Sequence, residues 1–191
     1  NAILDATSFA HSLESYGFEV LLRTNLDDKS FKIAIYEFRD RIEELGSDTT
    51  ALFFYSGHGI QASDTNYLIP IGADVRSESD LDVDAISGNR VMAAIERSDG
   101  VKIVILDACR NNPFRGFVKS PKQGLAQMDA PTGTIIGYST GPGKLAVDGA
   151  EGENGPYTRH LIGAISEPGK TIEEVFKETR KRVREETSGQ Q

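Results

Sequence analysis

One cysteine and one histidine of this sequence stand in polar segments that follow apolar runs. His58 lies in Ser-Gly-His-Gly after the run 51–55, and Cys109 lies in Asp-Ala-Cys-Arg after the run 101–106. A thiol attacks a carbonyl best as thiolate, and a nearby imidazole can take its proton and later protonate the leaving amine. If the two residues meet, they could act as nucleophile and general acid–base in acyl transfer.

The two runs are nearly continuous in apolar residues, which is the composition of strands covered on both faces. Parallel strands end at one edge of their sheet, and ligand sites gather there. His58 and Cys109 are therefore expected at one rim. Gly59 has no side chain to crowd its backbone N–H, so the N–H groups of Gly59 and Cys109 could face a developing oxyanion.

Other apolar spacings predict the elements around these two strands. The first expected helix carries Phe9, Leu13 and Tyr16 on one face, and a second carries Phe31, Ile35, Phe38, Ile42 and Leu45. A short helix is expected at 91–97, and a last one begins at the capping box of Thr171 and Glu174. Further strands are expected at 18–22, 67–71 and 133–138, and turn-rich segments at 61–87, 111–132 and 141–156. Strands alternating with helices predict an α/β fold, a mostly parallel central sheet flanked by helices.

Length and charge restrict the function classes. With 191 residues and 38% hydrophobic content the chain fits one domain with a real core. A formal net charge of -8 argues against nucleic acid or an anionic membrane as partner and favours a basic ligand. Neither a membrane span nor a signal peptide is visible, which constrains localisation only weakly, with the cytoplasm favoured. The single cysteine excludes an internal disulfide and leaves Cys109 as either a packed or a reactive thiol.

Taken singly, both residues have ordinary explanations. A histidine between glycines is more often a loop residue than a catalyst, and a lone cysteine at a strand end more often packs in the core. Their shared position after buried strands makes the catalytic interpretation stronger than either residue does alone.

These segments resemble the caspase superfamily of cysteine peptidases. The resemblance rests on Ser-Gly-His-Gly after one apolar strand and Asp-Ala-Cys-Arg after another, and it extends to Tyr-Leu-Ile-Pro at 67–70 and Cys-Arg-Asn-Asn-Pro-Phe at 109–114. Asp107 stands where the caspase signature has Gln, and Asn111 where it has Gly, so the likeness is to metacaspases, paracaspases and bacterial relatives of orthocaspase type. It implies a three-layer sandwich, residues 1–191 as one peptidase domain, and a first strand before Asn1 that this sequence lacks.

The resemblance also implies the substrate. Relatives with Asp two positions before the cysteine cleave after Arg or Lys, and Asp107 matches them. Asp5 and Asp148 are implied as further acidic groups of the same pocket, because paired carboxylates suit a guanidinium. For Asp107 the alternative is a carboxylate that caps backbone N–H groups, and for Asp5 and Asp148 it is simple exposure.

Three further expectations concern regulation. Arg110, Arg115, Lys119 and Lys122 lie after the cysteine, where an enzyme selective for basic residues could cut its own chain. The acidic stretch 78–84 resembles no known calcium loop, so an exposed loop is favoured over a calcium site, and the chemistry requires no cofactor. A homodimer stays open.

The residues predict a thiol–imidazole dyad, and the resemblance implies a cysteine endopeptidase that cleaves a protein or peptide after Arg or Lys through an acyl-enzyme on Cys109. Two other classes stay open. A catalytically silent caspase-like scaffold would keep the sheet without the chemistry. A thiol hydrolase of small amides would share the dyad but would not need an acidic pocket.

Overall fold

A computed structural model describes residues 1–109, 125–141 and 146–191, with the side chain of Cys109 outside that description. Within these described residues, five strands form one sheet in the order β3-β2-β1-β4-β5. They are β1 (Ala51–Ala62), β2 (Thr65–Leu68), β3 (Ile86–Ser87), β4 (Lys102–Cys109) and β5 (Thr134–Tyr138). The strands β1, β4 and β5 are parallel, and β2 and β3 add an antiparallel margin. The expected mostly parallel α/β sheet is confirmed.

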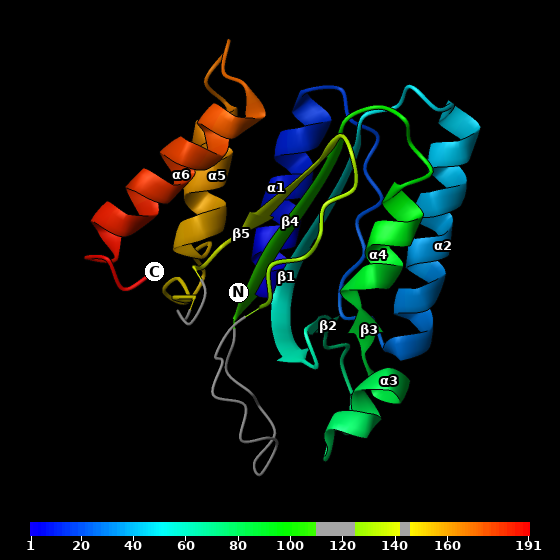
Figure 1. Ribbon diagram of the computed structural model, residues 1–191. Helices are drawn as coiled ribbons and strands as arrows, with labels where there is room; N and C mark the ends of the chain where they lie inside the picture. The colour runs from blue at the N-terminus through cyan, green and yellow to red at the C-terminus, as the bar shows by residue number, and fades with distance from the viewer. Residues whose placement is uncertain (110–124, 142–145) are drawn as a thin grey trace.

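Helices cover both faces of this sheet (Figure 1). The helices α1 (Ala2–Ser15), α5 (Pro156–Ile165) and α6 (Ile172–Glu186) lie on one side, and α2 (Asp28–Leu45) and α4 (Gly88–Ile95) lie on the other. A 3-10 turn, η1 (Glu78–Asp80), and the short α3 (Leu81–Asp84) precede β3. In the described part of the chain, no helix combines the length and apolar character that crossing a membrane requires.

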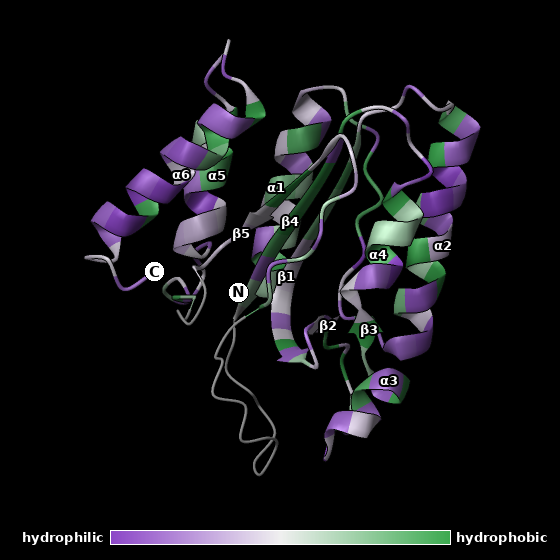
Figure 2. Ribbon diagram, in the orientation of Figure 1, coloured by the Kyte–Doolittle hydropathy of each residue, from purple (hydrophilic) through white to green (hydrophobic). Residues whose placement is uncertain are grey.

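The side chains of β4 divide between the two layers because successive residues of a strand point to opposite faces. Val104, Leu106 and Ala108 join the cluster under α2 and α4, whereas Ile103 and Ile105 join the cluster under α1, α5 and α6. Figure 2 shows this apolar strand between helices whose outer faces are polar. The alternation places Asp107 on the α1 and α5 face, which decides its partners.

A cavity runs along one edge of β1. Over residues 51–58, β1 pairs with β4 on one side, and no strand that the structure describes pairs with it on the other. The free edge borders a cavity of about 520 Å³, whose opposite wall is the segment 18–26. The expected strand at 18–22 is wrong: this segment belongs to no strand. Its apolar residues favour an extended chain, but the cavity separates it from any strand with which it could pair.

Other boundaries also differ from expectation. The strands continue through the polar segments, so His58 and Cys109 lie inside β1 and β4 rather than after them. The segment 61–87 is less irregular than expected, because it holds β2, η1, α3 and β3. Tyr16 and Leu45 are largely exposed at helix ends and do not join the core. The capping box of Thr171 and Glu174 is confirmed at the start of α6.

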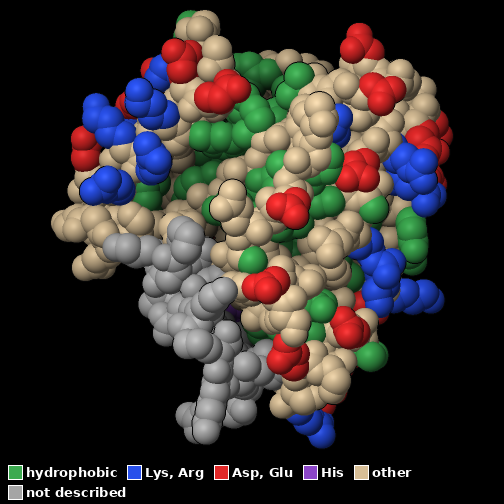
Figure 3. Space-filling model, viewed as in Figure 1, with side chains coloured by type: hydrophobic (Ala, Val, Ile, Leu, Met, Phe, Trp, Pro, Cys, Tyr) green, Lys and Arg blue, Asp and Glu red, His purple; other side chains and the backbone are tan. Residues whose placement is uncertain are grey.

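Charge is unevenly distributed on the surface. Figure 3 shows Lys and Arg side chains gathered over α6, where the exposed basic residues of the helix are Lys177, Arg180, Lys181 and Arg184. This basic face of α6 lies on an acidic protein, although α6 as a whole also carries glutamates. The net charge of -8 therefore describes the chain as a whole but not every face of it.

Candidate active site

The sheet places the backbones of His58 and Cys109 side by side. The parallel pairing of β1 with β4 runs from Ala51–Lys102 to a last pair formed by His58 and Cys109. Neighbouring strands lie about 4.8 Å apart, so residues distant in sequence become adjacent at this position. The side chain of His58 is exposed. The expected common rim thus holds at the level of the backbone.

The peptide group between His58 and Gly59 has a fixed direction. The carbonyl oxygen of His58 accepts a hydrogen bond from the N–H of Ile69 at 3.0 Å and another from the hydroxyl of Tyr55 at 2.8 Å. Ile69 directly follows β2, so this carbonyl points toward the β2 side. In a planar trans peptide the N–H points opposite to the C=O. The N–H of Gly59 is therefore directed toward β4, the strand of Cys109.

Gly59 also allows a close approach. It is buried, and a Cβ atom at this position would lie 3.1 Å from both the Cβ of Ala108 and a methyl carbon of Leu125. Such contacts are tighter than ordinary packing allows. A side chain here would push β1 and β4 apart beside the last strand pair.

Asp107 is buried on the α1 and α5 face, with 8% of its surface exposed. The hydroxyl of Thr158, in the first turn of α5, donates to its Oδ2 at 2.8 Å. Burial raises the pKa of Asp107 to about 6, while the Thr158 hydrogen bond acts in the opposite direction. Thr158 is thus one donor that holds this carboxyl. The alternative expected for Asp107 was a carboxylate that caps backbone N–H groups. Among the described residues, no backbone N–H donates to it.

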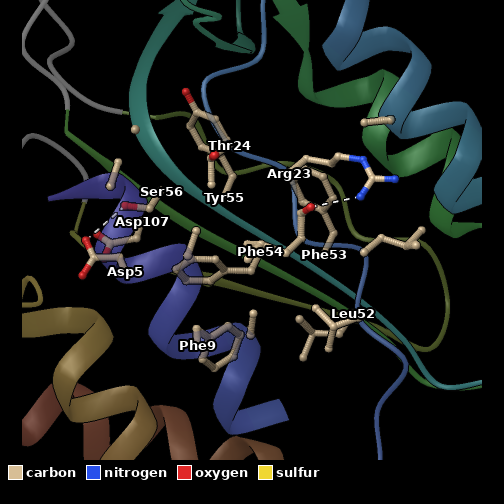
Figure 4. A pocket seen from close by; sticks show the side chains of 18 of the residues that line it. Asp5, Phe9, Arg23, Thr24, Leu52, Phe53, Phe54, Tyr55, Ser56 and Asp107 are labelled. Atoms are coloured by element: carbon tan, nitrogen blue, oxygen red, sulfur yellow. Dashed lines mark hydrogen bonds between the residues drawn. The ribbon is translucent and has the colours of Figure 1, made fainter. Parts of the chain in front are cut away.

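Asp5 is anchored rather than free. It is 5% exposed, its Oδ1 accepts from the N–H of Gly155 at 2.9 Å, and its Oδ2 accepts from the hydroxyl of Ser56 at 3.2 Å. Burial raises the pKa of Asp5, and these hydrogen bonds lower it. Figure 4 shows Asp5, Ser56 and Asp107 grouped together at one end of the pocket, beyond Phe9 and Phe54. Simple exposure is therefore wrong for Asp5.

Asp148 completes the acidic group. Its side chain is exposed, as the simpler alternative expected, yet its negative charge raises the pKa of both Asp5 and Asp107. All three carboxylates line the same cavity as His58. The structure therefore brings together the three acidic residues that the sequence suggested, at the end of the cavity where β1 and β4 hold the His58–Cys109 pair.

Sequence reasoning missed the residues that hold these carboxylates. Ser56 stands in the histidine segment itself, where its place two residues before His58 on the same face of β1 was the available signal. Gly155 and Thr158 belong to the start of α5, a helix that was not expected. Its apolar spacing at Tyr157, Leu161 and Ala164 could have revealed it.

The acidic stretch before β3 is structural. Asp80 accepts hydrogen bonds from the backbone N–H groups of Arg76 and Ser77, and Asp82 accepts from the hydroxyl of Tyr67. Glu78 to Asp84 is helical rather than an open loop. No cluster of three metal-ligating side chains occurs in the described residues. The four basic residues proposed as self-cleavage positions, Arg110, Arg115, Lys119 and Lys122, lie outside the description.

Comparisons with known proteins agree with this architecture. A search of curated proteins yields no match. The family model described as the caspase domain of peptidase family C14 matches residues 1–191. That span includes the five-stranded sheet, the helices on both of its faces, and the paired His58 and Cys109 positions. The chain therefore belongs to the caspase-domain family of cysteine peptidases.

Proposed function

We propose that this domain is a cysteine endopeptidase that cleaves proteins or peptides after Arg or Lys. The observation that carries the specificity is the pair of buried carboxylates, Asp5 and Asp107. Among the described residues, no Lys or Arg side chain forms an ion pair with either one. A buried anion is costly without a cationic partner. A substrate guanidinium or ammonium would supply that partner, and Asp148 adds negative charge to the same cavity.

The catalytic proposal uses His58 and Cys109. His58 takes the proton of the Cys109 thiol, and the thiolate attacks the scissile carbonyl carbon. The negative charge on the carbonyl oxygen is met by the N–H groups of Gly59 and Cys109. His58 then protonates the leaving amine, which leaves a thioester on Cys109. Water, deprotonated by His58, hydrolyses that thioester and restores the thiol. The direction of the Gly59 N–H supports this arrangement, and the chemistry needs no cofactor.

Fluorogenic peptides that end in Arg, Lys or Asp, offered to the wild type, Cys109→Ala and His58→Ala, test both parts. We expect turnover of the Arg and Lys peptides by the wild type alone. Equal turnover by wild type and Cys109→Ala would refute the nucleophile, and a preference for Asp would refute the specificity.

Covalent labelling separates the enzyme from a silent scaffold. A peptidyl chloromethyl ketone that ends in Arg should add its mass to the wild type and not to Cys109→Ala. An analogue that ends in Asp is the matched reagent and should react far more slowly. Absence of any adduct on Cys109, with the protein folded by circular dichroism, would favour the scaffold.

A further inference from the structure

Tyr55 approaches the histidine segment from the α2 face of the sheet, opposite to the face that carries Asp107. Its ring stacks on Phe31 of α2, with 5.9 Å between the ring centroids and 20° between the ring planes. Its hydroxyl donates to the carbonyl oxygen of His58 at 2.8 Å and lies 3.2 Å from the carbonyl oxygen of Ile69. Burial raises the pKa of Tyr55, so the phenol stays neutral and remains a donor. A rigid, packed aromatic ring therefore delivers one hydrogen bond to the backbone beside the candidate dyad.

Gly57 leaves the space for this contact. A Cβ atom at position 57 would lie 2.6 Å from the Tyr55 hydroxyl oxygen and 2.9 Å from the ring carbon that bears it. The φ angle of Gly57 is also positive, at 157°. Any side chain at this position would displace the hydroxyl from the His58 carbonyl. The first glycine of Ser-Gly-His-Gly is therefore required so that the hydroxyl of Tyr55 can reach the His58 carbonyl.

The Tyr55 bond acts on both ends of one peptide group. The His58 C=O and the Gly59 N–H share a plane, so holding the oxygen also sets the direction of the N–H. We propose that Tyr55 is a positioning residue that aims the Gly59 N–H at the oxyanion of the reaction. This inference rests on the proposed function of the dyad. It assigns the aim of the donor to a residue whose hydroxyl bonds backbone carbonyl oxygens.

Tyr55→Phe removes the hydroxyl and keeps the ring. Misaiming a donor should cost less than deleting it, so we expect kcat on an Arg peptide to fall about tenfold, with KM within about twofold of wild type. A peptide aldehyde that ends in Arg forms a hemithioacetal whose oxygen takes the oxyanion position. Its affinity should weaken in proportion to kcat/KM. Alkylation of Cys109 by iodoacetamide, which uses no oxyanion donor, should keep the wild-type rate.

Two further variants sharpen the test. Tyr67→Phe removes a hydroxyl from the neighbouring strand, where it contacts Asp82, and should leave every one of these measurements unchanged. Gly57→Ala should reproduce the Tyr55→Phe loss, and the double variant should lose no more than either single change. Active sites are counted by titration, so a variant that folds poorly does not lower the constants per site.

The outcomes separate the two proposals. If the wild type shows no Cys109-dependent hydrolysis, the proposed function fails. If the wild type is active and Tyr55→Phe keeps its kcat and aldehyde affinity, the positioning role is wrong. An alkylation rate that falls together with kcat would also overturn it, because the disturbance would then lie in the dyad rather than in the oxyanion donor.

Discussion

Asp107 has opposite effects on binding and on stability. Because Asp107 is buried without a cationic partner among the described residues, it could bind the basic side chain of a substrate. The same burial makes its ionised form costly in the folded state. Its pKa of about 6 lies above the ordinary value of 3.8. The folded protein therefore holds a proton there more tightly than the unfolded chain does, and ionisation at neutral pH lowers the free energy of unfolding.

Asp107→Asn should therefore stabilise the protein while it abolishes cleavage after Arg. Above pH 6 the stabilisation should approach about 3 kcal/mol, the value of roughly two pKa units. It should vanish as pH falls below about 4, where the carboxyl is protonated in both states. Urea unfolding of both proteins between pH 4 and pH 8 measures it. Asp48→Asn is the matched control, because that side chain is exposed in the turn before β1, and a pH-independent difference for Asp107→Asn would contradict the argument.

The helix α5 organises the acidic group at the scale of elements. Gly155 at its N-cap holds Asp5, and Thr158 in its first turn holds Asp107. One short helix thus joins a carboxylate from α1 to a carboxylate from β4. The position of α5 therefore bears directly on the geometry of the proposed substrate pocket.

Thr158→Val tests this role of α5. The Thr158 hydrogen bond lowers the pKa of Asp107, so its loss should raise that pKa further above 6. Because the charged carboxylate binds the basic side chain, the acid limb of kcat/KM on an Arg peptide should move to higher pH. Thr179→Val removes another buried hydroxyl, one that bonds the Val175 carbonyl within α6, and should leave the limb in place. If the acid limb of kcat/KM stays in place in Thr158→Val, the proposed contact between Asp107 and the basic side chain of the substrate is wrong.

The elements differ in how far the sequence could predict them. The strands at 51–55 and 101–106 were predictable because residues covered on both faces must be apolar along their whole length. The strand ends were not, because pairing with β2 and β4 carries β1 through Gly57 and Gly59 despite their low strand propensity. The segment 18–22 shows the converse, since a strand-like composition forms no strand without a partner in reach.

The site was predictable in its residue types and not in its contacts. Asp107 could be suggested because it stands in the cysteine motif, and Asp5 and Asp148 because the family resemblance implies them. The hydrogen bonds of Asp5 and Asp107 could not, since Ser56, Gly155 and Thr158 reach these carboxylates only when α1, β1, β4 and α5 pack together. Tertiary packing decides which polar atoms meet, and a single sequence carries no direct record of that.

At the scale of the whole molecule, the sheet is open along β1. Backbone groups of residues 51–58 on that edge have no strand partner in the described chain, and the cavity beside them lies between the α1 and α2 layers. An extended segment of about eight residues, at about 3.3 Å each, would match this edge. A strand parallel to β1 would end at the rim of the sheet where Asp5, Asp107 and Asp148 lie. Asn1 lies at the same rim, where its side chain donates to the Gly149 carbonyl at 2.9 Å.

The free edge of β1 should accept an apolar strand that is added before Asn1 through a short linker. A fusion of eight alternating Val and Ile residues should raise the melting temperature, by about 2–4 °C for each kcal/mol gained. The amides of Leu52, Phe54 and Ser56, which alternate with those that face β4, should also become protected from hydrogen exchange, because they would gain partners. The same fusion with two prolines cannot pair and is the matched control. Equal melting temperatures for the two fusions would show that the edge of β1 does not accept a strand.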